Sequence, residues 1–91
     1  MATKEKIRED QNFNPEIEGK YYLVLHNDEV NTFEFVIESL IDVCGHDKIQ
    51  AEQCATLTHY KGKCDVKKGS FDNLKMMKDA LTDRGLSVTI N

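Results

Sequence analysis

Polar side chains gather at one junction of the sequence, where an apolar run ends and a helix-like segment begins. Asn27 and Asp28 directly follow the run Tyr21–His26. An amide and a carboxylate on rigid supports can face the same point, where they offer a small cationic group a charge and hydrogen-bond acceptors. Asn and Asp between a strand and a helix also commonly form turns and caps. The pattern alone leaves two interpretations open, a cation site and a structural turn.

His59 is a further candidate for the same chemistry. It precedes Tyr60 near the end of a helix-like segment that stops near Gly62. Its neutral imidazole could accept a hydrogen bond from an ammonium group near pH 7. A single histidine in this position is also common as a helix C-terminal cap or as a surface residue. A ligand role and a structural role therefore both remain open for His59.

Metal binding and thiol catalysis are disfavoured by the spacing of the cysteines and histidines. The three cysteines form no close pair, which argues against a zinc site and against a disulfide framework. Cys54 and His59 are five residues apart on one predicted helix, which separates them by roughly 140° around its axis. The sequence also lacks a phosphate loop, a nucleophile elbow and a Cys-x-x-Cys motif. We therefore expect no metal, no cofactor and no enzymatic activity.

Length and composition describe one small soluble domain. The 91 residues suffice for a single hydrophobic core, and 40% hydrophobic with 31% charged residues is ordinary for a globular chain. The formal net charge of −4 argues against nucleic-acid binding, which needs clustered positive charge. No apolar run approaches the ~20 residues that span a bilayer, and the polar start of the chain lacks a secretory signal. We expect a cytoplasmic protein without a membrane or nucleic-acid partner.

The first predicted elements are a strand and an amphipathic helix. Tyr21–His26 is aromatic and β-branched, which predicts a buried strand. Asn31, with Glu34 three residues later, forms a capping-box pattern that starts a helix, and Gly45 is suited to end it. The apolar stripe of this helix, expected to face the core, consists of Phe33, Val36, Ile37, Leu40, Ile41 and Cys44.

Two further helices are predicted from their caps. Asp47, with Gln50 three residues later, starts the second helix, and Ser70 starts a third that ends at Gly85. One face of the second helix carries small residues, expected either to pack closely against another element or to form the floor of a pocket: Ala51, Cys54, Ala55 and Thr58. The third helix is expected to turn Phe71, Leu74, Met77 and Leu81 inward.

Strands complete the predicted order. Residues 64–67 are a short strand candidate, and Leu86, Val88 and Ile90 alternate in a final strand. The order β-α-α-β-α-β predicts an α+β fold in which a three-stranded sheet packs against three helices. We expect residues 21–91 to form this domain. Residues 1–20, with scattered apolar residues and the only proline, are expected to form a flexible tail.

Two motifs in this order resemble the ClpS family of adaptors for Clp proteases. The first lies within Leu25–Leu40, where Asn27-Asp28-Glu29 precedes Phe33-Glu34-Phe35-Val36. The second is Thr58-His59-Tyr60-Lys61-Gly62, which resembles the helix-ending segment of that family. The resemblance covers about residues 21–91 and is most specific up to Gly62. Details such as Cys54 resemble a divergent branch, of the form found in Bacteroidetes.

The resemblance implies a binding function. ClpS proteins recognise N-degron peptides and deliver them to a Clp AAA+ unfoldase, docking on the N-terminal domain of ClpA or ClpC. By resemblance, Asn27, Asp28 and His59 would hold the peptide's α-amino group. An apolar pocket would receive its first side chain, in the family Leu, Phe, Tyr or Trp. The matching pocket positions are Asn31, Phe33, Val36, Ala55, Thr58 and Leu86. The tail resembles the delivery extension of the family.

Departures from the family pattern leave an alternative open. The family has Thr-Pro-Met where this chain has Asn31-Thr32-Phe33, and the methionine acts there as a pocket gatekeeper. Thr58 replaces a usual valine, and the match weakens after Lys63. We expect the α-amino site to be retained and the side-chain preference to be altered. The alternative is a Clp-binding modulator that has lost or altered N-degron recognition.

Overall fold

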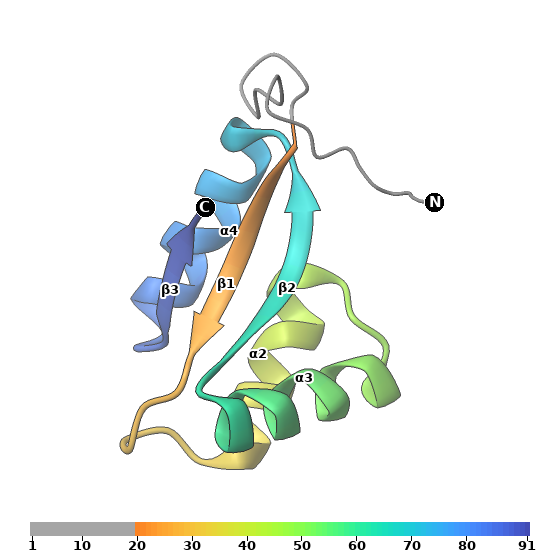
Figure 1. Ribbon diagram of the computed structural model, residues 1–91, viewed down its shortest axis with the longest axis vertical. Coiled ribbons are helices and arrows are strands. Elements are labelled where there is room, and N and C mark those ends of the chain that lie inside the picture. Colours follow the sequence, from red (N-terminus) through yellow and green to blue (C-terminus); the bar gives the residue numbers. More distant parts are fainter. Residues whose placement is uncertain (1–19) are drawn as a thin grey trace.

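Residues 20–91 are described by the computed structural model, and they form one α+β unit (Figure 1). The element order is β-α-α-β-α-β, as the sequence predicts. The predicted tail, apart from Lys20, lies outside the described residues. The elements are β1 (Tyr21–His26), α2 (Phe33–Cys44), α3 (Lys48–Lys61), β2 (Lys63–Gly69), α4 (Phe71–Asp83) and β3 (Ser87–Ile90).

The sheet is antiparallel and has the strand order β2-β1-β3, so the first strand lies in the centre. This position leaves β1 without a free edge, and Leu23, Val24 and Leu25 on it are all buried. Between Leu23 and Val24 the register with β2 shifts by one residue, which makes Val66 the extra residue of a β-bulge. The Val66 carbonyl accepts a hydrogen bond of 2.6 Å from Nε2 of His46, a buried side chain.

The helices pack on different strands of the sheet (Figure 1). α4 packs chiefly on β3 and β1, while α3 packs on β2 and against α2. The core between them is made of aliphatic side chains and thiols that are less than one-tenth exposed: Leu23, Leu25, Leu40, Cys44, Ala51, Cys54, Val66, Leu74, Leu81, Leu86 and Val88. The end of β1, the start of α2 and the end of α3 therefore meet on one side of the molecule.

The helix caps agree with the predictions at two of three positions. Oδ1 of Asp47 accepts a hydrogen bond of 2.7 Å from the Gln50 amide, and Ser70 caps α4. The prediction that Asn31 caps α2 is wrong. The cap is Thr32, which has extended backbone angles and whose Oγ1 accepts a hydrogen bond of 3.0 Å from the Phe35 amide. Asn31 is instead engaged outside the helix, as described below.

The apolar stripe of α2 is only partly buried. Leu40 and Cys44 lie in the core, as predicted, but Phe33 remains 44% exposed and Ile41 36% exposed. On α4, Leu74 and Leu81 are buried while Phe71 is 46% exposed and packs edge-on against Tyr21, with ring centroids 5.5 Å apart. The strand expected at residues 64–67 extends over Lys63–Gly69. Among residues 20–91, none of the helices has both the length and the apolar character that crossing a membrane requires.

Candidate functional site

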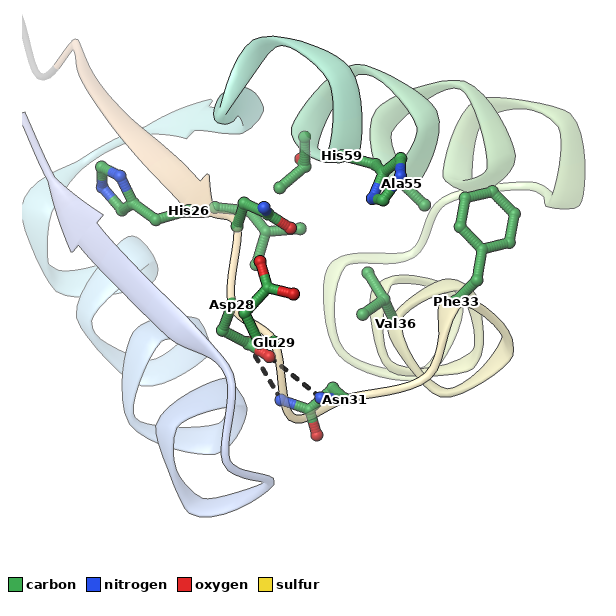
Figure 2. A pocket seen from close by; sticks show the side chains of 11 residues that line it. His26, Asp28, Glu29, Asn31, Phe33, Val36, Ala55 and His59 are labelled. Carbon is green, nitrogen blue, oxygen red and sulfur yellow. Dashed lines mark hydrogen bonds between the residues drawn. The ribbon is translucent and has the colours of Figure 1, made fainter.

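A pocket of about 300 Å³ opens where β1, α2 and α3 meet (Figure 2). The end of β1 and the loop after it supply its polar side, the first turns of α2 supply an apolar wall, and the second half of α3 supplies the facing wall. Its lining residues are Leu25, His26, Asn27, Asp28, Glu29, Asn31, Phe33, Val36, Ala55, Thr58 and His59.

The end of β1 is tied to the end of α3, which brings Asn27 and His59 to the same pocket. The backbone N–H of Asn27 donates a hydrogen bond of 2.9 Å to the carbonyl of Gly62. Gly62 has φ +93°, a left-handed conformation that ends α3 and that favours glycine. His59 lies in the last turn of α3, and its ring packs edge-on against Tyr60 with centroids 4.9 Å apart.

Asp28 organises the loop between β1 and α2. Its Oδ1 accepts hydrogen bonds of 2.9 Å from the backbone N–H groups of Val30 and Asn31, and its Oδ2 accepts one of 3.0 Å from the side-chain amide of Asn31. Burial acts to raise the pKa of this carboxyl, but the bonds from Asn31 and Val30 outweigh burial and lower the pKa below its ordinary value of 3.8. Asp28 is therefore ionised at neutral pH. A carboxylate has about four lone-pair sites, so one remains for a further donor.

The Asp28 carboxylate sets a direction for the dependence of stability on pH. Its pKa is lower in the folded chain than the ordinary value of 3.8. The stabilisation that it contributes is thus complete above the ordinary value and is lost as the pH falls through the lower, folded value. The hydrogen bonds of the turn should remain intact at pH 5, and a site that uses this carboxylate should remain charged there.

Asn31 links this loop to a distant part of the chain. Besides its bond to Asp28, its side-chain amide donates a hydrogen bond of 2.9 Å to the backbone carbonyl of Gly85. Gly85 lies between α4 and β3 and has φ +91°, which favours glycine at this turn. The position of Asp28 therefore depends on contacts with residues more than 50 positions away, since the Asn31–Gly85 bond spans 54 residues.

The charges around the pocket favour a cation. Two carboxylates, those of Asp28 and Glu29, line it together with the imidazoles of His26 and His59, and no Lys or Arg is among its lining residues. His59 also lies at the C-terminal end of α3, where the helix dipole places partial negative charge. The partial negative charge at this end of α3 adds to the negative charge of the Asp28 and Glu29 carboxylates. The site is suited to an ammonium group that needs several acceptors.

The opposite wall of the pocket is mostly apolar. Val36 and Ala55 face it from α2 and α3, and Phe33 lies at its edge (Figure 2). Thr58 is buried, and its hydroxyl donates a hydrogen bond of 2.8 Å to the carbonyl of Cys54. That bond uses the only proton of the hydroxyl, so a molecule in the pocket would meet an acceptor or the methyl group of Thr58 rather than a donor.

The structure brings together all of the sequence-predicted site residues except one. Leu86, predicted for the side-chain pocket, is only 4% exposed and lies in the core. Three further residues that sequence reasoning did not select also line the pocket: Leu25, His26 and Glu29. Glu29 was detectable from its place beside Asp28. His26 was detectable as the last residue of a strand that leads into the polar cluster, and its Nε2 forms a hydrogen bond of 2.8 Å with the Thr89 hydroxyl.

Two of the three thiols have raised pKa values. Burial raises the pKa of Cys44 from 9.0 to about 11. Burial, and a hydrogen bond with the thiol of Cys54, raise the pKa of Cys64 from 9.0 to about 12. Within residues 20–91, no three His, Cys, Asp or Glu side chains lie close enough together to hold a metal ion. Burial thus disfavours the thiolate forms of Cys44 and Cys64.

We predict that the native protein resists alkylation of these thiols. At pH 8 a rise in pKa from 9.0 to about 11 lowers the thiolate fraction of Cys44 about 100-fold, and Cys64 is lowered further. Iodoacetamide labelling followed by mass spectrometry should show slow modification of Cys44 and Cys64 in buffer. In urea the same residues should react at the rate of ordinary thiols. Fast labelling of Cys64 in the native protein would contradict the assigned environment.

Fold and pocket together define a small α+β domain whose pocket has an acidic, polar side and an apolar wall. Comparison with known proteins gives its family. Residues 16–89 match the family model of the ATP-dependent Clp protease adaptor protein ClpS, and the chain belongs to this family of adaptors. No curated protein matches the sequence.

Among solved structures, the chain is similar to Agrobacterium tumefaciens ClpS2 bound to L-phenylalaninamide. The TM-score is 0.70 at 23% sequence identity, and the similarity covers 80% of this chain and 95% of that one. At this identity the match establishes a shared fold. The predicted α+β arrangement is thereby confirmed.

Proposed function

We propose that this chain binds the N-terminal residue of N-degron peptides and delivers the proteins that carry them to a Clp AAA+ unfoldase. The observation that carries the proposal is the convergence of Asn27, Asp28 and His59 on one pocket that also has an apolar wall. The first residue of a peptide is the ligand that presents an ammonium group and a side chain within a few ångströms of each other. Family membership supports the adaptor role.

The α-ammonium group would occupy the polar side of the pocket. The Asn27 side chain and the His59 imidazole would each accept one of its hydrogen bonds, and the remaining lone-pair site on Asp28 would pair with its charge. Hydrogen bonds to charged groups are stronger than neutral ones, and a desolvated ammonium needs all of its donors satisfied. A blocked N-terminus would have neither the charge nor these donors.

The first side chain would lie against the apolar wall. Burying a Leu or Phe side chain is worth ~1.5–3 kcal/mol, and a pocket of about 300 Å³ can hold either. The similar ClpS2 structure has L-phenylalaninamide bound, a molecule with a free α-amino group and a benzyl side chain. We therefore propose bulky hydrophobic first residues, Leu, Phe, Tyr or Trp. With Phe33 and Thr58 at the pocket, the preference among these four is expected to differ from that of the family.

The first experiment is fluorescence anisotropy with a labelled peptide that begins with Phe or Leu, measured against its N-acetylated twin. Acetylation removes the charge and leaves every side chain in place, so binding should be lost on acetylation. A panel that varies only the first residue would then measure the preference. Equal binding of both twins, or no binding across all first residues, would sink the proposal.

That negative outcome would favour the second candidate, a Clp-binding modulator without N-degron recognition. The observation that favours it is the pocket itself, which carries Phe33 and Thr58 where the family has methionine and valine. The modulator would still bind a Clp chaperone. Both candidates therefore predict binding to the purified N-terminal domain of ClpA or ClpC, and titrating each domain in turn would identify the partner.

A further inference from the structure

A groove of about 500 Å³, termed the α4 groove, lies where the end of β2, the middle of α4 and the end of α2 meet. It shares no lining residue with the peptide pocket. Its apolar part consists of Val43, Leu74, Met77 and Ala80, and Met76, which is 73% exposed, also lines it. Methionine side chains are flexible and adapt to the shape of what they contact. The α4 groove can therefore receive a segment with apolar side chains.

The charged side chains of the α4 groove leave an excess of positive charge. Lys67 and Lys68 line it from β2, and its one lining carboxylate, that of Asp42, is already paired with Arg84 at 3.3 Å. The Lys67 ammonium donates a hydrogen bond of 3.1 Å to the carbonyl of Cys44, which leaves two of its three donors. Among residues 20–91, neither lysine forms a salt bridge. An occupant with carboxylates as well as apolar side chains would match this groove.

A segment of this chain that lies outside the described residues has that composition. Residues 13–18 read Phe-Asn-Pro-Glu-Ile-Glu. They supply two large apolar side chains, Phe13 and Ile17, and two carboxylates, Glu16 and Glu18, without any Lys or Arg. Both the apolar character and the sign of the charge complement the α4 groove.

The segment is also attached at the right place. Tyr21, the first residue of β1, pairs with Gly69, which lines the α4 groove, so the chain enters β1 beside the groove. The groove follows α4 from Asn73 to Ala80, about 10 Å at 1.5 Å per residue. Seven residues, 13–19, can span up to about 25 Å. A short covalent connection gives an effective concentration of the order of millimolar, so even a weak contact would be populated.

We infer that residues 13–18 bind in the α4 groove of their own chain. Phe13 and Ile17 cover the methionines of the groove, and the carboxylates of Glu16 and Glu18 lie near Lys67 and Lys68. The contact goes beyond the proposed function, because it governs the N-terminal segment and not the residue that the peptide pocket binds. The N-terminal residues resemble a delivery extension, so a bound segment would be held against the domain and released when a partner takes its place.

Methyl NMR of the full chain tests the contact, because two of its three methionines, Met76 and Met77, line the α4 groove. With ¹³C-labelled methionine methyl groups, Glu16→Lys with Glu18→Lys should shift both signals. The reversed charges repel the lysines of the groove and should lower the ratio of bound to free segment about tenfold. Ile17→Ser should shift the signals in the same direction, because it removes an apolar contact.

A matched control and a groove variant locate the contact. Glu5→Lys with Glu9→Lys changes the net charge equally but outside residues 13–18, so it should leave both methionine signals in place. In a chain that carries Lys68→Glu, an exposed position, the reversal at Glu16 and Glu18 should have at most half its effect, since one of the two groove cations is gone. Circular dichroism melts would verify that these variants fold.

A separate peptide of residues 11–19 provides an independent test. It is N-acetylated, so that it cannot place a free ammonium group in the peptide pocket. Added at millimolar concentration to the full chain with Glu16→Lys and Glu18→Lys, it should return the Met76 and Met77 signals toward their wild-type positions.

Three results would contradict the inference. Signals that are the same in the wild-type chain, the charge-reversed chain and Ile17→Ser, and that do not respond to the acetylated peptide, would overturn it outright. An equal shift in the Glu5→Lys with Glu9→Lys control would show an effect of net charge alone. An undiminished effect in the Lys68→Glu chain would overturn the assignment to the α4 groove. Each of these results would leave peptide binding, measured by anisotropy, untouched.

Discussion

The variant Asp28→Asn should bind a free N-terminal peptide roughly 10- to 100-fold more weakly than the wild-type chain, because one hydrogen bond between charged groups contributes about 1.5–3 kcal/mol. The asparagine retains an oxygen that can accept the backbone N–H groups of Val30 and Asn31, the two bonds now made by Oδ1. Its NH2 group cannot accept the bond that Oδ2 now takes from the Asn31 side chain, so the unfolding free energy should fall by about 1 kcal/mol. Anisotropy and urea denaturation measure the two quantities.

The companion variant Asp28→Ala separates charge from turn structure. It removes all three hydrogen bonds that Asp28 accepts and should lower the unfolding free energy by about 1–2 kcal/mol, with a loss of affinity at least as large as that of the asparagine variant. Asp83→Asn, an exposed change on α4, is the control and should alter neither quantity. If Asp28→Asn bound peptide as well as wild type while Asp28→Ala lost only stability, Asp28 would be a turn residue and no part of the ammonium site.

Local signals in the sequence were sufficient to predict the fold. Aromatic and β-branched residues predicted β1, and the caps Asp47 and Ser70 marked the starts of α3 and α4, because each of these patterns acts within a few residues. The α2 cap failed for a reason that is not local. Asn31 and Thr32 are both good cap residues, and a contact made by Asn31 far along the chain decides between them.

The candidate site shows the same difference between local and long-range signals. Asn27, Asp28 and His59 belong to two short motifs, so they could be selected from the sequence, whereas their meeting in one pocket depends on the bond between the Asn27 amide and Gly62. The misplaced residue, Leu86, was selected by resemblance alone, and it lies in the core because it immediately precedes β3 and packs with the inward residues of the sheet. Burial of this kind follows from tertiary packing, which periodicity does not specify.

The same long-range contact makes Asn31 a positioning residue. In Asn31→Ala, the Asp28 carboxylate and the Gly85 carbonyl each lose a donor, which should lower the unfolding free energy by about 1–2 kcal/mol. Peptide affinity should fall about three- to tenfold, because Asp28 would then be held only by backbone bonds and its loop would lose its tie to the α4–β3 turn. Asn73→Ala on α4 is the matched control, since the backbone N–H of Asn73, and not its side chain, makes the cap contact with Ser70.

The pKa of Asp28 shows whether Asn31 positions this carboxylate or only stabilises the fold. The side-chain bond from Asn31 is one of the interactions that lower the Asp28 pKa, so in Asn31→Ala this pKa should rise toward 3.8. An NMR titration of the carboxyl group in the folded variant measures the change without a peptide. If Asn31→Ala lowered the unfolding free energy but changed neither the Asp28 pKa nor the peptide affinity, Asn31 would only connect the two loops and would not position the carboxylate. A raised pKa together with weaker binding would show that a residue outside the ammonium site controls how its carboxylate is presented, through a bond to the turn before β3.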